Sequence, residues 1–539
     1  MKIIVERRKM KKIFLLFTML ILISCGGAGK ESKSSENTKI IVNETAEPKS
    51  IDPGILTDQT GIAVNSLVSE GLARQGKDGT PEPGLAEKWD ISEDGLTWTF
   101  HLRENVKWSD GEPVTADDFK FAWLRVLDPA TASEYAYMLY PVKGAQAYNE
   151  GKGKKEDVGI NVVDSRTLEV KLEKPTAYFA SLAASATYSP IREKFFYEKG
   201  KDFALEADAM EYSGPYKIKS WKHDSSFVMV KNENYWNKDH IKIDEIEMVL
   251  VADSTAELNA FNNDEIDLIR LTAEQYKRYE KDPRVNVFRN NSVWYLEYNM
   301  DNKYLANKKI RQALTLAVDK EEMANTIIKG TGEPAYGIVP TGFPGENKTF
   351  REEAGDSYPK YNPEEAKKLY KEGLAELGVT ELPELSLIIN EAGNNKKIAE
   401  YIQEKLRTNL GVNIRIEPIP FKDRMARLQQ KDFEIVLSGW GSDYADPMTY
   451  IDLFITNGGN NHSSYSNPKY DELIKTANNS GDNKVRMQAM RDAEKILGED
   501  MPVGVLHYST RVIMLNPKIK NVYFKGIGAE YYLYDAYVE

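Results

Sequence analysis

Only one of the 539 residues is a cysteine, and it lies at position 25. A chain with a single cysteine cannot form an intramolecular disulfide, so burial and polar pairing within the fold must supply its stability. A chain of this length also exceeds what one hydrophobic core usually holds, and we expect two or three domains. The fold is therefore predicted to be large and multidomain, without covalent cross-links.

Cys25 follows an apolar segment of 11 residues, 13–23, and the small residue Ser24, and basic residues precede that segment. This order is typical of a secretory signal peptide. The apolar segment is too short for a membrane-spanning helix, which needs ~20 residues. The sequence Leu-Ile-Ser-Cys resembles the lipobox of bacterial lipoproteins, and this resemblance implies that Cys25 becomes the first mature residue and carries lipid. An ordinary signal peptide, or a short anchor with an accidental cysteine, is the alternative.

The segment after Cys25 contains nothing that could build a core. Residues 26–39 are mostly glycine, serine and charged residues, so we expect a flexible tether before a globular part that begins near Ile40. The formal net charge of the chain is −12. An acidic surface disfavours nucleic-acid binding, which needs basic patches, and we expect no nucleic-acid partner. A charged small ligand stays possible because a pocket can differ in sign from the surface.

Helix and strand patterns alternate along the rest of the chain. Residues 98–103 alternate apolar and polar side chains, which predicts a half-buried strand. Residues 396–410 carry apolar side chains on one helical face and end at Gly411. Residues 412–416 then alternate as a strand, and a helix followed directly by a strand favours an α/β layer arrangement. Further predicted elements are a helix from Thr115 to Pro129, strands within 216–230, 241–251, 433–437 and 503–508, and helices around 310–317 and 484–497.

No motif of a catalytic or metal site stands out in the sequence. The five histidines are scattered without metal-ligand spacing. Gly-x-Ser-x-Gly, P-loop and His-Glu-x-x-His motifs are absent. Carboxylates are abundant, as a glycosidase would need, but no pair is singled out by its context. We therefore expect no metal, no cofactor and no catalysis, with an exported glycosidase or peptidase as the alternative from another class.

Two sequence blocks carry a family resemblance. Residues 84–129 contain GLAEKW, LTWTFHLRENVKWSDG, VTADDF and DP, and residues 438–447 read SGWGSDYADP. Shorter matches are GPY at 214–216, NYW at 234–236, IRQAL at 310–314 and NLGV at 409–412. From about residue 40 to the C-terminus, the chain resembles the peptide/nickel class of bacterial extracellular solute-binding proteins. The resemblance is greatest to the oligopeptide-binding lipoprotein of ABC importers.

The resemblance implies an α/β fold of the two-lobed periplasmic-binding-protein (flytrap) type, with an extra domain inserted in the first lobe. Such lobes close over a ligand by a hinge motion. The implied parts are a lipoprotein signal peptide at 1–24, a tether at 25–39, lobe I at 40–69, 195–293 and 511–539, an inserted domain at 70–194, and lobe II at 294–510.

The implied function is capture of peptides, with oligopeptides as the expected class, and their delivery to the transmembrane subunits of an ABC permease. An extended peptide can pair its backbone with protein strands, and its side chains can enter pockets in which water adjusts. The chain is expected to be a monomer, exported and held at the outer side of the cytoplasmic membrane, in a periplasm or at a cell surface, by lipid on Cys25. A non-peptide solute, such as a nickel complex, haem, a sugar or an opine, is the alternative within the class.

The resemblance also implies site residues. Asp443 would bind the peptide ammonium, and capping of a turn before Pro447 is the alternative. Gly439 and Gly441 would offer backbone groups because glycine lets another backbone approach closely, or they would mark a bulge. The remaining implied peptide-binding residues are Trp440, Tyr444, Tyr295, Glu297, Tyr135, Phe421, Thr57, Asp58 and Gln59. For Tyr295, a place in the core is the alternative.

Recognition of the peptide carboxylate stays open. Some oligopeptide-binding relatives place an arginine just before the strand glycine and a histidine ahead of a Lys-Lys pair. This chain has Leu437 and Asn395 at those places. The nearby cations Lys396, Arg424 and Arg427 could substitute, although cations on a helix face are usually solvated.

Overall fold

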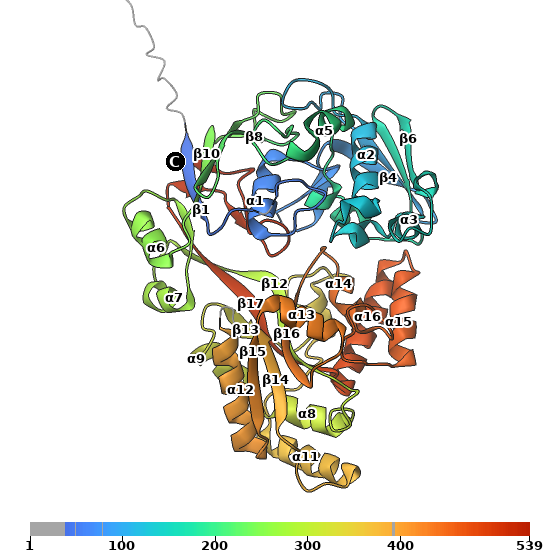
Figure 1. The fold of residues 1–539 in the computed structure, drawn as a ribbon, viewed down its shortest axis with the longest axis vertical. Coiled ribbons are helices and arrows are strands. Elements are labelled where there is room, and N and C mark those ends of the chain that lie inside the picture. Colours follow the sequence, from blue (N-terminus) through green and yellow to red (C-terminus); the bar gives the residue numbers. More distant parts are fainter. Residues whose placement is uncertain (1–37, 49, 78, 391–393) are drawn as a thin grey trace, which may run out of the picture. The chain divides into compact units, whose positions relative to one another are not determined.

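The computed structural model describes residues 38–48, 50–77, 79–390 and 394–539 (Figure 1). These residues belong to one compact unit. The predicted signal peptide, Cys25 and almost all of the predicted tether lie outside them. Within the described part of the chain, every helix is too short or too polar to cross a bilayer.

One large mixed sheet runs through this unit. Its strand order is β15-β14-β16-β12-β17-β11-β1-β10-β9-β8, and β13 also pairs with β17. The strands are β1 (Lys39–Glu44), β8 (Tyr216–Lys222), β9 (Ser226–Lys231), β10 (Glu245–Leu250), β11 (Leu268–Arg270), β12 (Val285–Tyr298), β13 (Gly332–Pro334), β14 (Leu385–Asn390), β15 (Ile414–Ile419), β16 (Ile435–Gly441) and β17 (Val503–Leu515). The long antiparallel strands β12 and β17 connect one group of strands to the other (Figure 1). The two lobes of the predicted fold are therefore joined by continuous strands.

A second sheet, of order β4-β5-β7-β6, lies in the segment predicted as an insertion. Its strands are β4 (Ala86–Ile91), β5 (Thr97–Leu102), β6 (Ile160–Asp164) and β7 (Thr167–Lys171). The predicted helix at Thr115 is α2 (Ala116–Leu127), and the carboxylate of Asp118 accepts a hydrogen bond from the Thr115 N–H at 2.7 Å, as a capping box requires. Phe100 on β5 and Phe119 on α2 belong to the same hydrophobic core as Val42 on β1. The core of the insertion is therefore continuous with that of lobe I.

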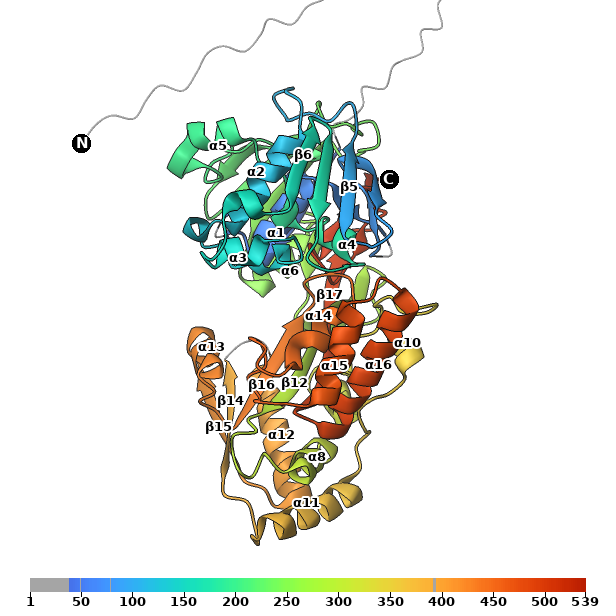
Figure 2. The same ribbon diagram turned by 90° about the vertical axis from the view of Figure 1, so that its right-hand side faces the viewer.

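Helices α8 (Lys308–Leu316), α11 (Pro363–Leu377) and α12 (Asn395–Leu410) share a core with β14, β15 and β16. A further core lies beneath α14 (Met448–Ile451), α15 (Pro468–Asn478) and α16 (Asn483–Asp500), and α15 and α16 lie side by side in Figure 2. Helix α12 ends at Gly411 as predicted, with φ 73°. The next strand begins at Ile414 rather than at Val412, because the Val412 N–H donates to Leu406 O at 3.3 Å and closes the helix end.

The remaining helices are short and mostly connect these layers. They are α1 (Gln59–Val68), α3 (Ala145–Asn149), α4 (Phe179–Leu182), α5 (Glu193–Lys199), α6 (Ser254–Asn262), α7 (Ala273–Tyr279), α9 (Lys320–Thr326), α10 (Phe350–Ala354) and α13 (Phe421–Gln429). The 3₁₀ turns are η1 (Pro129–Thr131), η2 (Ala136–Leu139), η3 (Lys155–Asp157), η4 (Ala186–Tyr188), η5 (Gly200–Asp202) and η6 (Asp452–Phe454). Short strand pairs are β2 (Ala73–Gln75) with β3 (Pro81–Pro83), β18 (Ile519–Lys520) with β21 (Tyr537–Val538), and β19 (Tyr523–Phe524) with β20 (Tyr531–Tyr532).

The strands that join the lobes are not regularly paired along their whole length. The register of β12 on β17 shifts between Arg289 and Val293, and Asn291 in this stretch has φ 52°. Bulges of this kind bend and twist a strand. The predicted lobe boundaries at 293/294 and 510/511 fall within β12 and β17, so they mark points along strands rather than loops.

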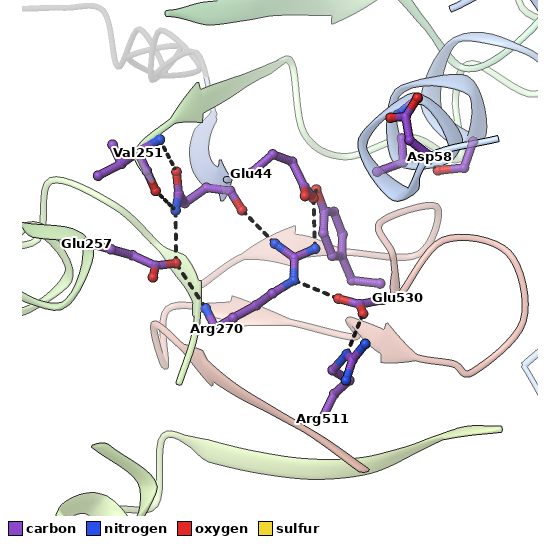
Figure 3. A network of polar contacts seen from close by, with 12 residues as sticks. Glu44, Asp58, Val251, Glu257, Arg270, Arg511 and Glu530 are labelled. Atoms are coloured by element: carbon purple, nitrogen blue, oxygen red, sulfur yellow. Dashed lines mark hydrogen bonds and ion pairs between the residues drawn. The ribbon is translucent and has the colours of Figure 1, made fainter. Parts of the chain in front are cut away.

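A buried ion network ties the C-terminal segment to lobe I (Figure 3). Arg270 on β11 contacts Glu44 on β1 at 3.0 Å and Glu530 at 2.6 Å. Arg511 on β17 contacts the other oxygen of Glu530 at 2.9 Å. Burial raises the pKa of Glu44. Burial also opposes ionisation of Glu530, yet the charges of Arg270 and Arg511 hold its pKa below the ordinary value. The network therefore fixes the last residues of the chain beside the strands that join the lobes.

Candidate ligand-binding site

Asp443 lies just after β16, where lobe II meets the inserted segment. Its carboxylate accepts a hydrogen bond from Tyr137 Oη at 3.0 Å, and its own N–H donates to Thr449 Oγ1 at 3.2 Å. Among the described residues, no cation lies within 4.0 Å of this carboxylate. Burial raises the pKa of Asp443 to about 6, although the bond from Tyr137 opposes the shift. The carboxylate is thus partly desolvated and lacks a counter-charge.

The nearby Asp446 has a different role. Both of its oxygens contact the guanidinium of Arg486 at 3.0 Å, and both residues are buried. Its Oδ1 also accepts from the Met448 N–H at 3.0 Å, which closes an Asx turn across Pro447. The turn before Pro447 is therefore capped by Asp446, which leaves the carboxylate of Asp443 unused by the turn.

Further contacts join the inserted segment to lobe II beside Asp443. The rings of Tyr178 and Tyr444 stack with centroids 4.4 Å apart and planes 4° from parallel. The Ala445 N–H donates to Ser181 Oγ at 3.1 Å. Asp443 consequently lies at a place where two parts of the fold close against each other.

Two cavities border Asp443. The larger has a volume of about 340 Å³, and residues of α1, of the segment 69–77, of β12, of the β16 end and of the C-terminal segment line it. The smaller has a volume of about 180 Å³, and four aromatic side chains, four other apolar side chains and two carboxylates are among the residues that line it. A concave site with a few convergent polar groups is the usual form of a ligand-binding site.

The strand that leads to Asp443 has an open edge. β16 pairs with β12 along its whole length, but with β14 only at Ile435 and Val436. Among the described residues, 437–441 therefore have no strand on their other side. An extended ligand can add to such an edge by backbone pairing. The Leu437 carbonyl on this edge accepts from Arg424 Nη1 at 3.3 Å.

The two glycines of β16 meet different surroundings. A Cβ atom at Gly439 would lie 2.9 Å from the indole ring of Trp294 on β12. Packing inside the protein therefore requires glycine at this position, whether or not a ligand approaches. A Cβ atom at Gly441 would meet only the Ser292 hydroxyl, at 3.3 Å, and Gly441 borders the larger cavity.

Several other predicted site residues line the cavities. Tyr135 and Gln59 line the larger one, and Trp440 and Tyr444 line the smaller. The structure thus brings these four together around Asp443, although their contacts with a ligand stay predictions.

The three predicted site residues at the start of α1 differ in whether they line a cavity. Gln59 reaches the larger cavity, but Thr57 and Asp58 line neither cavity. Asp58 is the N-cap of α1 and accepts a hydrogen bond from the Gly61 N–H at 2.8 Å. The structure therefore gives Asp58 a local structural role.

Three predicted residues lie away from both cavities. Tyr295 is 4% exposed and packs edge-on against Phe454 in the core of lobe II. Glu297 is 1% exposed, and its Oε1 has no hydrogen-bond partner among the described residues. Phe421 is 59% exposed at the start of α13. None of the three lines the space beside Asp443 in this arrangement.

Lys396, Arg424 and Arg427, the cations considered for the peptide carboxylate, differ in burial and in whether an acidic side chain already contacts them. Arg427 contacts Glu417 and Asp432, each at 3.0 Å, and Lys396 is exposed. Arg424 is 6% exposed and has no carboxylate within 4.0 Å among the described residues. Burial lowers its pKa. Of the three, only Arg424 thus combines burial with the absence of an acidic partner among the described residues.

Sequence reasoning missed Tyr137, Tyr178 and Asp452 beside Asp443. Tyr137 follows Tyr135 in the turn η2, and the two rings are 6.0 Å apart. The density of tyrosines near Tyr135 was the only sequence signal, since nothing local indicates that this turn meets a residue 306 positions away.

Comparisons with known proteins agree with this arrangement. A family model described as bacterial extracellular solute-binding proteins, family 5 Middle, matches residues 80–462. The chain is 36% identical over 503 residues to the dipeptide-binding protein DppE of Bacillus subtilis (strain 168), covering 93% of this chain and 92% of that protein. It is 35% identical over 544 residues to the oligopeptide-binding protein OppA of the same strain, covering 98% of each. The solved structure of Listeria monocytogenes OppA bound to peptide matches with a TM-score of 0.77 and 36% identity, over 94% of this chain and 99% of that one. The predicted family and its two-lobed α/β fold are thereby confirmed: the chain belongs to family 5 of the bacterial extracellular solute-binding proteins.

Proposed function

We propose that this chain is the solute-binding component of an ABC importer, and that it captures peptides between its lobes and delivers them to the membrane permease. The observation that carries the proposal is the carboxylate of Asp443, which lacks a cation within 4.0 Å among the described residues and borders both cavities. A peptide ammonium supplies that cation. The relatives named for dipeptide and oligopeptide binding support this class of ligand.

The proposed binding mode follows the open edge of β16. The ammonium contacts Asp443, and the peptide backbone pairs with residues 437–441 while running antiparallel to them. Side chains then extend into the cavities, where water fills the space that a given residue leaves. In this binding mode the protein recognises the ammonium group and the backbone, which all peptides share, so it suits a receptor for peptides of many sequences.

The same mode suggests a partner for the peptide carboxylate. Arg424 donates to Leu437 O and Ser438 Oγ at 3.3 and 3.4 Å, at the far end of the open edge from Asp443. We place the carboxylate of a short peptide beside this arginine, whose charge a carboxylate would balance. Each ligand residue spans roughly 3.3 Å along a strand, so a ligand of a few residues would reach from one charge to the other.

The proposal includes export, lipid on Cys25 and a monomeric chain that catalyses nothing. The order of basic, apolar and small residues before Cys25 supports export and processing, and the family description supports an extracellular place. A receptor that only opens and closes must stay near its permease, and a lipid-anchored tether keeps its local concentration high. Mass spectrometry of the mature N-terminus tests the lipid, with Cys25→Ser as the variant that should leave the membrane fraction.

The central experiment is incubation of the full chain with a defined peptide mixture, followed by mass spectrometry of retained and released species. Retention of intact peptides supports a receptor. Appearance of cleavage products would instead indicate a peptidase. Retention of no peptide, together with binding of a sugar or haem offered in parallel, would replace the peptide proposal by the non-peptide alternative.

A further inference from the structure

The smaller cavity has unusual walls for a general peptide site. The aromatic rings of Tyr137, Tyr178, Trp440 and Tyr444 line its 180 Å³, and Asp443 and Asp452 bring carboxylates to it. Pockets for whole small ligands usually enclose roughly 300–1,000 Å³. The smaller cavity is therefore of a size for one side chain rather than for a complete solute.

The carboxylate of Asp452 is not balanced by an adjacent cation. Asp452 opens the turn η6 after α14, and no cation of the described residues lies within 4.0 Å of it. Burial is the main reason why its pKa is raised to about 7. The positive charge of Lys174 opposes that shift from a greater distance, and the negative charges of Asp443 and Asp446 add to it. The charge of Asp446 is itself balanced by Arg486, which leaves Asp443 and Asp452 as two unpaired carboxylates on one cavity.

Tyr178 and Tyr444 stack on each other, and Arg486 lies over the Tyr178 ring, so Tyr137 and Trp440 are the rings of this cavity left to meet a cation. The face of an aromatic ring attracts a cation, and the attraction grows when the cation is desolvated. The indole N–H of Trp440 is also buried without a hydrogen-bond partner among the described residues. Such a donor calls for an acceptor from a bound molecule, and a peptide carbonyl supplies one.

We propose that the smaller cavity receives the side chain of the first peptide residue and selects lysine or arginine there. This inference rests on the proposed peptide function. Asp443 borders both cavities, so an ammonium bound to it places the first side chain at the mouth of the smaller one. A first residue of lysine or arginine carries a positive charge at each of two places, and two carboxylates line the cavity that would receive them.

Titration calorimetry of the full chain with matched peptides tests the inference. The peptides share all positions but the first, which is lysine, arginine or the uncharged isostere norleucine. We expect lysine and arginine to bind about tenfold or more tightly than norleucine, as for a desolvated charge pair. Equal affinities would overturn the inference and leave the peptide function standing. Failure of all three peptides to bind would overturn both.

Variants then assign the effect to Asp452. Asp452→Asn should remove most of the preference for lysine and leave norleucine binding nearly unchanged, whereas Asp239→Asn, an exposed carboxylate of lobe I, should change neither. Lys174→Met should also alter the preference, because it removes a positive charge that lowers the pKa of Asp452 and opposes a cationic side chain. The Lys174 variant keeps the assignment testable if Asp452→Asn fails to fold. A preference that survives both variants unchanged would show that Asp452 does not carry it.

Discussion

The phenol of Tyr137 donates a hydrogen bond to the carboxylate of Asp443 at 3.0 Å, although the two residues are 306 positions apart. Tyr137 belongs to the inserted segment, and Asp443 follows the strand β16 of lobe II. An ionised carboxylate accepts several hydrogen bonds, so this one leaves room for a ligand ammonium. The contact between the inserted segment and the end of β16 therefore uses the same carboxylate as the proposed ammonium site.

Replacement of Asp443 by asparagine should weaken peptide binding by roughly 2–5 kcal/mol, because a desolvated ammonium loses its charged partner. Calorimetry with a free peptide and its N-acetylated form checks the cause. Acetylation should weaken binding to the unmodified protein by a similar amount and have little further effect in Asp443→Asn. Asp239→Asn serves as the control for net charge. Full affinity in Asp443→Asn would remove Asp443 from the site.

Peptide affinity should depend on pH through Asp443. Its pKa in the unliganded protein is about 6, and a bound ammonium favours the ionised form and lowers that pKa. Affinity is therefore full between the unliganded pKa and the pKa of the peptide ammonium, about 8, and it falls by up to about tenfold per pH unit below the unliganded pKa, because one proton must leave for the peptide to bind.

Calorimetry between about pH 5 and about pH 8 measures this slope. A peptide that begins with alanine is the suitable ligand, because its side chain brings no charge toward Asp452, whose pKa is about 7. Burial raises the pKa values of Tyr137, Tyr178 and Tyr444, so the three phenols stay neutral over that range. In Asp443→Asn the slope should disappear, and a slope that persists there would assign the proton to another group.

Whether Arg424 binds the peptide carboxylate can be tested with peptides that have or lack a free carboxylate. Arg424→Met should weaken binding of a short peptide with a free carboxylate by roughly 1.5–3 kcal/mol, the range for a hydrogen bond to a charged group. The amidated form of the same peptide should lose little. Arg427→Met is the matched control on the same helix, since Arg427 already contacts Glu417 and Asp432. An equal loss for both peptide forms would mean that Arg424 supports β16 rather than the ligand.

The two glycines of β16 should respond differently to alanine. Gly439→Ala forces a Cβ atom to within 2.9 Å of the Trp294 ring and should lower the free energy of unfolding by about 1–3 kcal/mol. Gly441→Ala should cost less than about 1 kcal/mol, because only the Ser292 hydroxyl is near. Urea denaturation compares them. Trp294→Leu combined with Gly439→Ala should recover part of the loss, and no recovery would contradict the steric explanation.

The network around Arg270 should be important for stability. Arg270→Met leaves the carboxylate of Glu44, which is buried, without its cation, and we expect a loss of about 3–5 kcal/mol in the free energy of unfolding. Lys360→Met breaks an exposed pair with Asp356 at 3.9 Å and a contact with the Tyr336 ring at 5.5 Å, and it should change stability by less than about 1 kcal/mol. Comparable losses in the two variants would show that the network adds no stability beyond that of a surface pair.

Periodicity and capping determined much of the secondary structure in advance. The alternation at 98–103 and the capping box at Thr115 depend on neighbours within a few residues, and both appear as β5 and α2. Gly411 ends α12 for an equally local reason, its positive φ. The strand after it begins later than predicted because the Val412 N–H serves the helix end, and periodicity alone does not show where a backbone donor is used.

By itself, the sequence determined the family and the two-lobed class of fold, because these depend on blocks of residues that can be read without the tertiary structure; it also predicted Asp443 as a ligand-binding residue. Only the tertiary structure decided which residues surround Asp443. Tyr137 reaches it from a segment 306 positions away, and Asp452 is brought back toward it by the turn that follows α14. Tyr295 lies in the core rather than beside the cavities, since a strand pattern shows that its faces differ but not which face meets the other lobe. Gly439 is required by a ring on the neighbouring strand, a contact that exists only once the register of β12 and β16 is set.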